Sequence, residues 1–287
     1  MSSVPFRRVA IIGTGLIGGS FALALRGLIP DVELIGYSHA GSSERARAAG
    51  VVDDATTDIA SAVRGADLVY VALPIGTSIE SLGSIAKAAA ANALVTDACS
   101  TKTAICRAAK EHFRGGIRFL GGHPMAGKEQ SGVEHADENL FRGAPYALMG
   151  LDSDADARVK AFGEIVRGLG ARPIWTDPET HDWAVGIVSH LPQLVSIALA
   201  RVVQDETDET GLPLSLSGPG LHDMLRLAGS PYEIWRDILL TNTDNVSRAL
   251  DRLAQAVDYL RTNLARKELQ QEFHTANDLY KQLRKPC

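Results

Sequence analysis

The chain has 287 residues, of which 45% are hydrophobic and 22% are charged, and its formal net charge is -5. Single hydrophobic cores rarely keep growing to this length, so we expect two domains. A negative chain without a Lys/Arg cluster is atypical of nucleic-acid binders. No run of about eighteen apolar residues occurs, so we expect no membrane span.

The cysteines and the N-terminus indicate the compartment. Cys99, Cys106 and Cys287 are odd in number and lack the spacing of a metal finger. They fit reduced thiols rather than disulfides or metal ligands. The chain begins without a charged-then-apolar signal segment. We therefore expect a cytoplasmic protein with no metal site.

The first forty residues predict a dinucleotide site. Arg8 to Ile12 resembles a strand, and the sequence Gly13-Thr14-Gly15-Leu16-Ile17-Gly18 follows it and opens an apolar helix. In this setting Gly13 makes the tight turn, Gly15 lets the backbone approach a pyrophosphate, and Gly18 allows close helix–strand packing. The phosphates then sit on free N–H groups at the helix N-terminus, where Leu16 and Ile17 begin it.

The next predicted strand, Val32 to Tyr37, carries the signal for cofactor choice. NAD-selective sites place an acidic residue about 20 residues past the glycines, where it binds the ribose 2′-OH. Ser38 stands there instead. Without that carboxylate a 2′-phosphate is not repelled, and Ser38, His39 and Arg45 are candidate contacts. We lean towards NADP, with a site that accepts either cofactor as the alternative.

Strands and helices continue to alternate up to residue 176, which predicts an α/β Rossmann-type domain over residues 1–176. Leu73 and Pro74 end the strand beginning at Asp67, and we place both among the cofactor-binding residues. Further strands are expected at 93–96, 117–120, 145–149 and 173–176, and helices at 79–91, 103–112 and 156–169.

Two polar residues follow predicted strands of this domain. Ser100 sits where a strand gives way to a helix, so its hydroxyl either caps that helix or meets a ligand. His123 follows the strand Ile117 to Leu120, and Pro124 biases it towards extended backbone. Ligands of open α/β sheets lie at the carboxyl ends of strands. His123 is therefore either a ligand contact or a histidine satisfied by a carbonyl in a glycine-rich turn.

From residue 177 onward the pattern is helical, and we expect an all-α domain over residues 177–287. A long apolar helix is predicted from His181 to Val203. Pro192 cannot donate to the carbonyl of Val188, so this helix must kink or open there. His190, beside that break, is either a polar contact to a ligand or a core histidine.

Later helices supply a candidate anion site and an interface. Asp223 and Arg226 lie three residues apart, so they share a helix face on which a carboxylate can hold a guanidinium. An arginine held this way suits capture of a substrate carboxylate, and the neighbouring leucines predict partial burial. The alternative is a surface ion pair. Apolar stripes between Asn245 and Arg284 predict core packing or a dimer interface.

Taken in order, the motifs of the chain resemble prephenate/arogenate dehydrogenase of tyrosine biosynthesis. The resemblance covers nearly the whole chain and rests on six motifs in addition to their order: the glycine loop, Asp97-x-x-Ser100-x-Lys102, Gly122 to Gly132, His181-Asp182, Ser189-His190-Leu191-Pro192, and Asp223-x-x-Arg226 through Trp235-Arg236-Asp237.

The resemblance implies a Rossmann domain followed by a helical dimerisation domain similar to that of 6-phosphogluconate dehydrogenase, and hence a homodimer. It implies oxidative decarboxylation of prephenate to 4-hydroxyphenylpyruvate, or of arogenate to tyrosine, with hydride transfer to NAD(P)+. His123 would accept the substrate hydroxyl proton and Ser100 would hold the same hydroxyl. The substrate side would comprise Arg226, His190, Glu129, Lys128, Asp223 and Trp235, in the cleft between the domains.

Some positions depart from the expected pattern. His222 stands where Arg or Lys is expected, and Lys128 where a smaller residue is common. We expect no regulatory domain and no fused mutase. Two rival interpretations remain. One is a β-hydroxyacid dehydrogenase or imine reductase on the same plan, which would use a lysine or aspartate from the first long helix of the second domain. The other is a non-catalytic NAD(P) sensor, which would not require Ser100, His123, His190 and Arg226 to converge.

Overall fold

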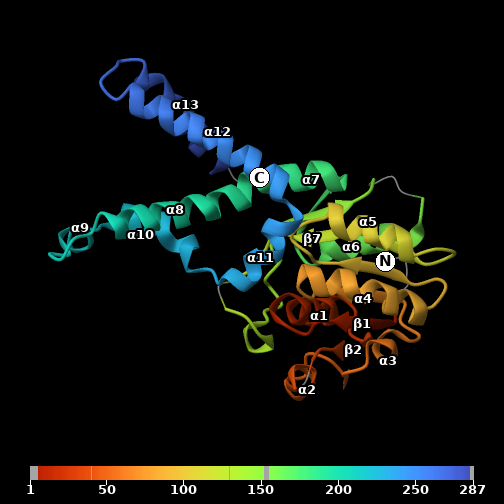
Figure 1. The fold of residues 1–287 in the computed structure, drawn as a ribbon. Coiled ribbons are helices and arrows are strands. Elements are labelled where there is room, and N and C mark those ends of the chain that lie inside the picture. Colours follow the sequence, from red (N-terminus) through yellow and green to blue (C-terminus); the bar gives the residue numbers. More distant parts are fainter. Residues whose placement is uncertain (1–5, 40, 129, 152–154, 285–287) are drawn as a thin grey trace.

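The computed structural model describes residues 6–39, 41–128, 130–151 and 155–284. It consists of an α/β body, which holds the N-terminal half, and a set of helices from which two long arms extend (Figure 1). The architecture is therefore the predicted one, a Rossmann-type domain followed by an all-α domain.

The body is built on a six-stranded parallel sheet with the order β3-β2-β1-β4-β5-β6. Parallel pairing in this order brings the carboxyl ends of all strands to one edge. The strands are short, nearly continuous apolar runs because helices cover both faces. Their bounds are Arg8–Ile12 (β1), Glu33–Tyr37 (β2), Asp54–Thr56 (β3), Leu68–Val71 (β4), Leu94–Asp97 (β5) and Arg118–Leu120 (β6).

Six helices connect these strands and the second sheet. The core between helices and sheet includes Phe21, which stacks on Tyr70 with ring centroids 3.8 Å apart. The sequence patterns missed the short elements β3, α2 and α3 but located α1, α4, α5 and α6. Their bounds are Leu16–Leu28 (α1), Ser42–Ala48 (α2), Ile59–Val63 (α3), Ile75–Ala88 (α4), Thr103–His112 (α5) and Ala157–Gly168 (α6).

A second sheet, β7-β8-β9, corrects the expected setting of His123. This histidine does not follow β6 as a loop residue; it is the middle residue of its own strand, β7 (Gly122–Pro124). Strand β7 pairs antiparallel with β8 (Pro145–Met149), which pairs parallel with β9 (Arg172–Thr176). At Gly121, between the sheets, a Cβ would lie 2.7 Å from Met149 Cγ. The predicted extended backbone at His123 is thus correct, and pairing with β8 fixes it.

The helical part begins with an interrupted helix rather than with one continuous α-helix. Helix α7 (Pro178–Val185) passes through a π-helical turn, η2 (Gly186–His190), into α8 (Leu191–Asp205). The π turn ends two residues before Pro192 and contains Val188, so the helix opens where the missing N–H predicted it would. The remaining elements are Leu212–Ser215 (α9), Pro219–Leu225 (α10), Arg226–Gly229 (η3), Tyr232–Thr241 (α11), Thr243–Thr262 (α12) and Leu269–Leu283 (α13).

The arms expose large apolar side chains. Helices α8, α9 and α10 form one arm, and α12 and α13 form the other (Figure 1). Helix α13 has no buried residue, and its Phe273 and Leu283 are 69% and 77% exposed. The helical stretch Pro178–Asp205 is long and apolar enough to cross a membrane, by length and composition alone. The sequence shows no uninterrupted apolar run there because polar residues are scattered along it. That stretch carries buried polar residues whose contacts are described below.

Candidate active site

The glycine loop has the geometry that a dinucleotide needs. Gly13 has φ +104°, and a Cβ there would lie 2.4 Å from the Ala72 carbonyl oxygen, so only glycine fits. At Gly18 a Cβ would lie 1.9 Å from the Gly13 carbonyl oxygen, which shows how closely helix and loop pack. Nothing lies within 4 Å of a Cβ built on Gly15, which begins α1 without a side-chain cap. The loop is therefore open where pyrophosphate would approach the N–H groups of α1.

The other residues predicted to bind the cofactor lie along the same sheet edge. Leu73 and Pro74 follow β4, next to Gly13. Ser38 directly follows β2; its side chain is buried and donates to the His39 carbonyl at 3.1 Å. His39 and Arg45 are exposed beside it. The residues present thus fit a nicotinamide dinucleotide, with a hydroxyl and not a carboxylate at the ribose position.

A buried ion pair anchors the strand that carries His123. Lys102 and Asp97 are fully buried and paired, and Lys102 Nζ also donates to the Gly122 carbonyl at 2.6 Å. The other Asp97 oxygen accepts from Gly122 N at 3.1 Å. Burial opposes the charge on Lys102, but the carboxylate of Asp97, together with Cys99 and Cys106, outweighs burial and raises the Lys102 pKa. Gly122 directly precedes His123 in the chain. Its N–H and its carbonyl are therefore held by groups of opposite charge.

His123 belongs to a chain of three buried side chains that crosses between the domains. His123 Nδ1 lies 2.9 Å from His181 Nε2, and His181 Nδ1 lies 2.9 Å from Asp182 Oδ1. Burial, and then the proximity of His181, Lys102 and His190, hold the pKa of His123 well below 6.5. His123 is consequently neutral at pH 7.

Hydrogen bonding fixes which nitrogen of His123 is protonated. The pKa of Asp182 is lowered although burial raises it, because His181, Thr103 and Lys102 all donate to its carboxylate. An ionised carboxylate only accepts, so His181 donates from Nδ1 to Asp182 and, when it carries no second proton, accepts at Nε2. His123 Nδ1–H then donates to His181. The lone pair of His123 is left on Nε2, the atom able to take up a proton.

Asp182 also caps a helix of the other domain. Its Oδ1 accepts from Lys102 N at 2.7 Å, and its Oδ2 from Thr103 N at 2.8 Å, at the start of α5. Ser100 therefore does not cap α5, which corrects the capping alternative. A carboxylate at a helix N-terminus is stabilised by the helix dipole as well as by the N–H groups.

Asp237 makes an analogous contact one helix away. Its Oδ2 accepts from Gly76 N at 3.0 Å in the first turn of α4, which has no side-chain cap of its own. Between the two caps, Thr101 Oγ1 and Thr241 Oγ1 lie 2.7 Å apart. The helical part thus caps two helices of the α/β body, and these contacts join the two parts of the chain.

His190, buried in the helical part, has the opposite hydrogen-bonding pattern. Its Nδ1 lies 3.1 Å from Asn242 Nδ2, which also donates to the Asp182 carbonyl at 2.7 Å. Asn242 Oδ1 accepts from Asn245, so the amide orientation is fixed. His190 Nδ1 must accept, and its proton is on Nε2. Burial is the largest cause that lowers the pKa of His190 to about 4.

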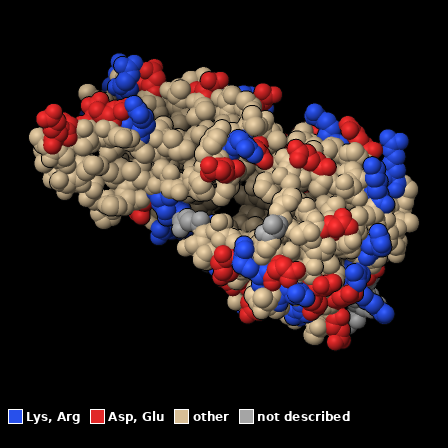
Figure 2. Space-filling model, turned by 60° about the horizontal axis from the view of Figure 1, so that its bottom comes forward, with Lys and Arg blue, Asp and Glu red and all other residues tan. Residues whose placement is uncertain are grey.

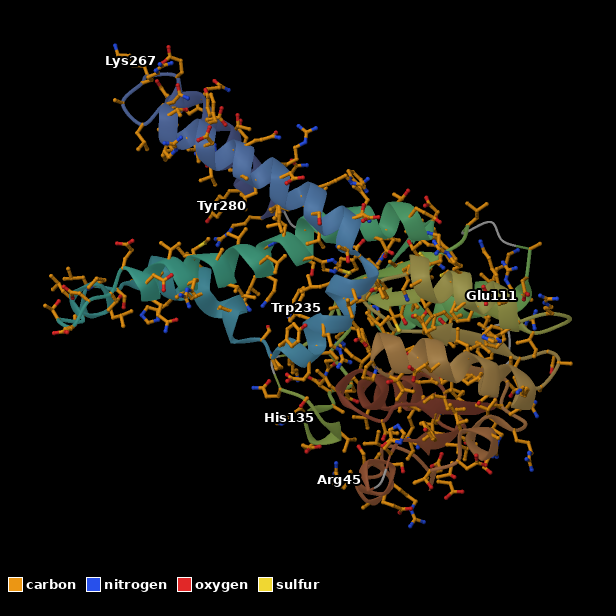
Figure 3. The ribbon with its side chains drawn as sticks, in the orientation of Figure 1. Arg45, Glu111, His135, Trp235, Lys267 and Tyr280 are labelled. Carbon is orange, nitrogen blue, oxygen red and sulfur yellow. The ribbon has the colours of Figure 1, made fainter. Side chains whose placement is uncertain are left out.

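The remaining predicted substrate residues are more exposed. Trp235 of α11 is half-buried, packs edge-on against His190 and lies where the α8 arm meets the body (Figure 3). Asp223 and Arg226 are exposed, which contradicts the predicted partial burial. Lys128 pairs with Asp137 at 2.9 Å. Glu129 lies outside the described residues. Figure 2 shows the surface hollowed between the α/β body and the helices.

His123 and His190 therefore converge on one network, and Arg226 is connected to it indirectly. Arg226 precedes Leu227, whose carbonyl accepts from Gln193 on α8, one helical turn beyond His190. Sequence reasoning assigned no role to His181, Asp182 or Asn242. The adjacent polar pair His181-Asp182, at the start of a long apolar helical segment, was the available signal for the first two. Nothing in the local sequence marks Asn242, because its role depends on where α11 ends.

The fold and this cleft define the class of the protein: a two-domain oxidoreductase with a nicotinamide-dinucleotide domain. Two family models cover most of the chain. Residues 21–175 match the prephenate dehydrogenase nucleotide-binding domain, and residues 177–279 match the prephenate dehydrogenase dimerization domain. The chain belongs to the prephenate/arogenate dehydrogenase family, as the motif resemblance predicted.

Relatives of this family align along nearly the entire chain. Prephenate dehydrogenase of Bacillus subtilis is 33% identical over 278 residues, covering 94% of this chain and 74% of the relative. The structure of prephenate dehydrogenase from A. aeolicus, in complex with hydroxyphenyl propionate and NAD+, has a TM-score of 0.88 at 29% identity and covers 96% of this chain and 98% of that one. Synechocystis arogenate dehydrogenase has a TM-score of 0.81 at 30% identity, covering 95% and 99%.

Proposed function

We propose that this chain catalyses the NAD(P)+-dependent oxidative decarboxylation of prephenate or arogenate in tyrosine biosynthesis. The observation that carries the proposal is the buried neutral His123, whose Nε2 lone pair is set by the Asp182–His181 chain. Family membership favours this activity over a β-hydroxyacid dehydrogenase, an imine reductase or a non-catalytic NAD(P) sensor.

The chemistry needs a base at one substrate atom. C4 of the substrate bears a hydroxyl and a hydrogen, and C1 bears a carboxylate whose loss makes the ring aromatic. His123 Nε2 takes the hydroxyl proton as the C4 hydride leaves. The C1 carboxylate then leaves as CO2, the electrons of the broken bond make the ring aromatic, and the proton on His123 returns to the ring oxygen. A bound nicotinamide supplies the acceptor for the C4 hydride. Aromatisation drives the reaction, so the protein mainly positions the substrate and holds one proton.

The other residues bind and orient the substrate in this proposal. Ser100, after β5, holds the C4 hydroxyl beside His123. His190 donates from Nε2, and Arg226, supported by Asp223, pairs with a carboxylate. Trp235 shapes the helical side by packing on His190. Lys128 and Glu129, on the loop after β7, border the entrance.

For the cofactor we propose that Gly13, Gly15 and Gly18 with Leu16 and Ile17 hold the pyrophosphate. Ser38, His39 and Arg45 lie at the ribose end, and the absence of a carboxylate at Ser38 favours NADP. S38D would restore the acid. We expect it to lower kcat/KM with NADP by about 10- to 100-fold relative to NAD, because charge repulsion opposes the 2′-phosphate. A wild-type preference for NAD, unchanged in S38D, would overturn the NADP assignment.

We also propose that the chain divides at residues 176/177 and forms a cytoplasmic homodimer through its helical arms. The exposed apolar faces of α8, α12 and α13 support the dimer, because a second copy would remove them from water. Sedimentation equilibrium should give the mass of two chains. A monomer at micromolar concentration would contradict the assignment.

A steady-state assay tests the activity itself. Purified wild-type chain is offered prephenate and arogenate, each with NAD+ and NADP+, and reduced cofactor is followed by absorbance. We expect turnover of at least one substrate and release of CO2 equal to the reduced cofactor formed. Tight cofactor binding without turnover of either substrate would reject the enzyme and favour a sensor.

A further inference from the structure

A buried threonine contact joins the segment that carries Ser100 to the helical part. Thr101 directly follows Ser100 between β5 and α5, and its side chain is 0% exposed. Its Oγ1 lies 2.7 Å from Oγ1 of Thr241, the last residue of α11. The contact therefore fixes the chain one residue beyond the hydroxyl that the proposed function assigns to the substrate.

The direction of this hydrogen bond follows from the second contact of Thr241. Thr241 Oγ1 donates to the Asp237 carbonyl at 2.7 Å, one turn earlier in α11. A hydroxyl has only one proton and a carbonyl only accepts, so Thr241 Oγ1 must accept from Thr101. Thr101 is thus a donor whose acceptor is held in place by the backbone of α11.

The residues around Ser100 are anchored, whereas the side chain of Ser100 is not. Before it, Cys99 N donates to a buried carboxylate at 2.9 Å, and after it Lys102 N donates to another at 2.7 Å. Within the described ranges no group hydrogen-bonds to the Ser100 hydroxyl. The position of that hydroxyl is therefore set by the residues beside it, of which Thr101 is the one fixed through its side chain to the helical part.

The end of α11 contacts both sides of the candidate site through two consecutive residues. Thr241 accepts from Thr101 beside Ser100. Asn242, the next residue, lies with its Nδ2 3.1 Å from His190 Nδ1 and fixes which nitrogen of that ring is protonated. The junction between α11 and α12 thus holds the hydroxyl of one side and the imidazole donor of the other in one frame.

We propose that Thr101, held by Thr241, is a positioning residue that keeps the Ser100 hydroxyl within hydrogen-bonding reach of the substrate C4 hydroxyl. The inference rests on the proposed function, in which Ser100 and His123 act at that hydroxyl, and adds the contact that holds Ser100 in place. Positioning of this kind affects turnover, because a displacement of about 1 Å in an active site can cost about 100-fold in rate.

Substitutions on the two sides of the contact test the hydrogen bond. T101V removes the donor and T241V removes the acceptor. We expect each to lower kcat about 10-fold, and the double variant to fall no further than either single variant. T101S keeps the donor and should stay within about twofold of wild type. T243V is the matched control, because Thr243 also donates to a carbonyl four residues earlier, at 2.7 Å, but is exposed and has no contact with Thr101 among the described residues.

A second cycle, with S100A, separates positioning from a structural role. If Thr101 acts through Ser100, T101V should lower kcat by less than about twofold once Ser100 is replaced. An equal loss of kcat from T101V in wild type and in S100A would overturn the inference, as would wild-type kcat in T101V together with a lowered free energy of unfolding in urea. T241V, at a partly exposed position, replaces T101V in the cycle if T101V does not fold. Failure of the proposed function gives a different result, namely no turnover of either substrate by wild type with either cofactor.

Discussion

The two sides of the cleft present histidines in opposite hydrogen-bonding states. His123, on a strand of the α/β body, is assigned a proton on Nδ1, which lies 2.9 Å from His181 Nε2, and a lone pair on Nε2. His190, at the end of a π turn in the helical part, accepts at Nδ1 from Asn242 and keeps its proton on Nε2. Both are buried and both have lowered pKa values. One face of the cleft therefore offers a base and the other a neutral donor.

The difference originates in what lies behind each ring. The Asp182 carboxylate only accepts hydrogen bonds, so it orients the proton of His181, and His181 in turn orients the proton of His123. Asn242 has a donor whose direction is fixed by Asn245. The same side chain thus performs two tasks because its second contacts differ, as is usual where one histidine nitrogen sets the state of the other.

The largest expected effect comes from removing the base. H123N should lower kcat by about 10²- to 10⁴-fold, since a positioned general base contributes about that much. Binding of the reduced cofactor, measured by fluorescence titration, should not change. H112N, on the exposed end of α5, is the control and should retain wild-type turnover. Turnover of H123N near the wild-type rate would reject His123 as the base.

Replacing Asp182, whose carboxylate orients His181 behind His123, should have the next largest effect. In D182N the amide can donate to His181 Nδ1, which reverses the protonation order and places the His123 proton on Nε2. We expect kcat to fall about 100-fold and the free energy of unfolding to fall by about 1–2 kcal/mol through the lost cap.

D237N separates these two consequences, because Asp237 caps α4 as Asp182 caps α5 but has no contact with the histidine chain among the described residues. It should lower the free energy of unfolding in urea by up to about 1 kcal/mol and leave kcat within about threefold. Equal losses of kcat in D182N and D237N would mean that Asp182 acts through domain docking alone.

On the opposite side, N242L removes the donor that holds His190. His190 can then take either tautomer, so we expect KM for the substrate to rise about 5- to 10-fold with a smaller change in kcat. The split between KM and kcat is the useful readout. A fall in kcat as large as that of H123N would show that the donor and base sides are not separable.

The smallest effect concerns stability and pH. Both histidines stay neutral in the folded chain below their ordinary pKa of about 6.5, whereas the unfolded chain takes up protons there. The free energy of unfolding should therefore fall as pH is lowered from about 6.5 towards 4, where His190 titrates, with up to about 1.4 kcal/mol per pH unit from each histidine. Urea unfolding of wild type and H190N at fixed protein concentration checks this. An identical slope in both would contradict the assignment for His190.

Much of the fold was predictable because its signals are local. The bounds of α5 and β8 match the predicted ranges, since alternation, glycine turns and helix periods are all written in neighbouring residues. The opening of the helix before Pro192 was predictable from the missing N–H alone. Strand β7 was not, because three residues carry no period and the strand exists only through pairing with β8.

The sequence predicted which residues belong to the site better than it predicted their contacts. His123, Ser100 and His190 were identified as candidates, but the capping alternative for Ser100 failed because Asp182, from the other domain, occupies that place. Burial of Arg226 was also predicted wrongly. Leucine neighbours in the sequence indicate an apolar helix face but not whether another element of the same chain covers it.

The protonation state of His123 is the central claim, and nitrogen NMR of the ¹⁵N-histidine-labelled protein measures it most directly. Comparison with H123N assigns the signals. The account predicts that at pH 7 the His123 ring is neutral, with its proton on Nδ1 and an unprotonated Nε2, and that D182N shifts the proton to Nε2. A His123 ring that is protonated on Nε2 in the wild-type protein at pH 7 would contradict it.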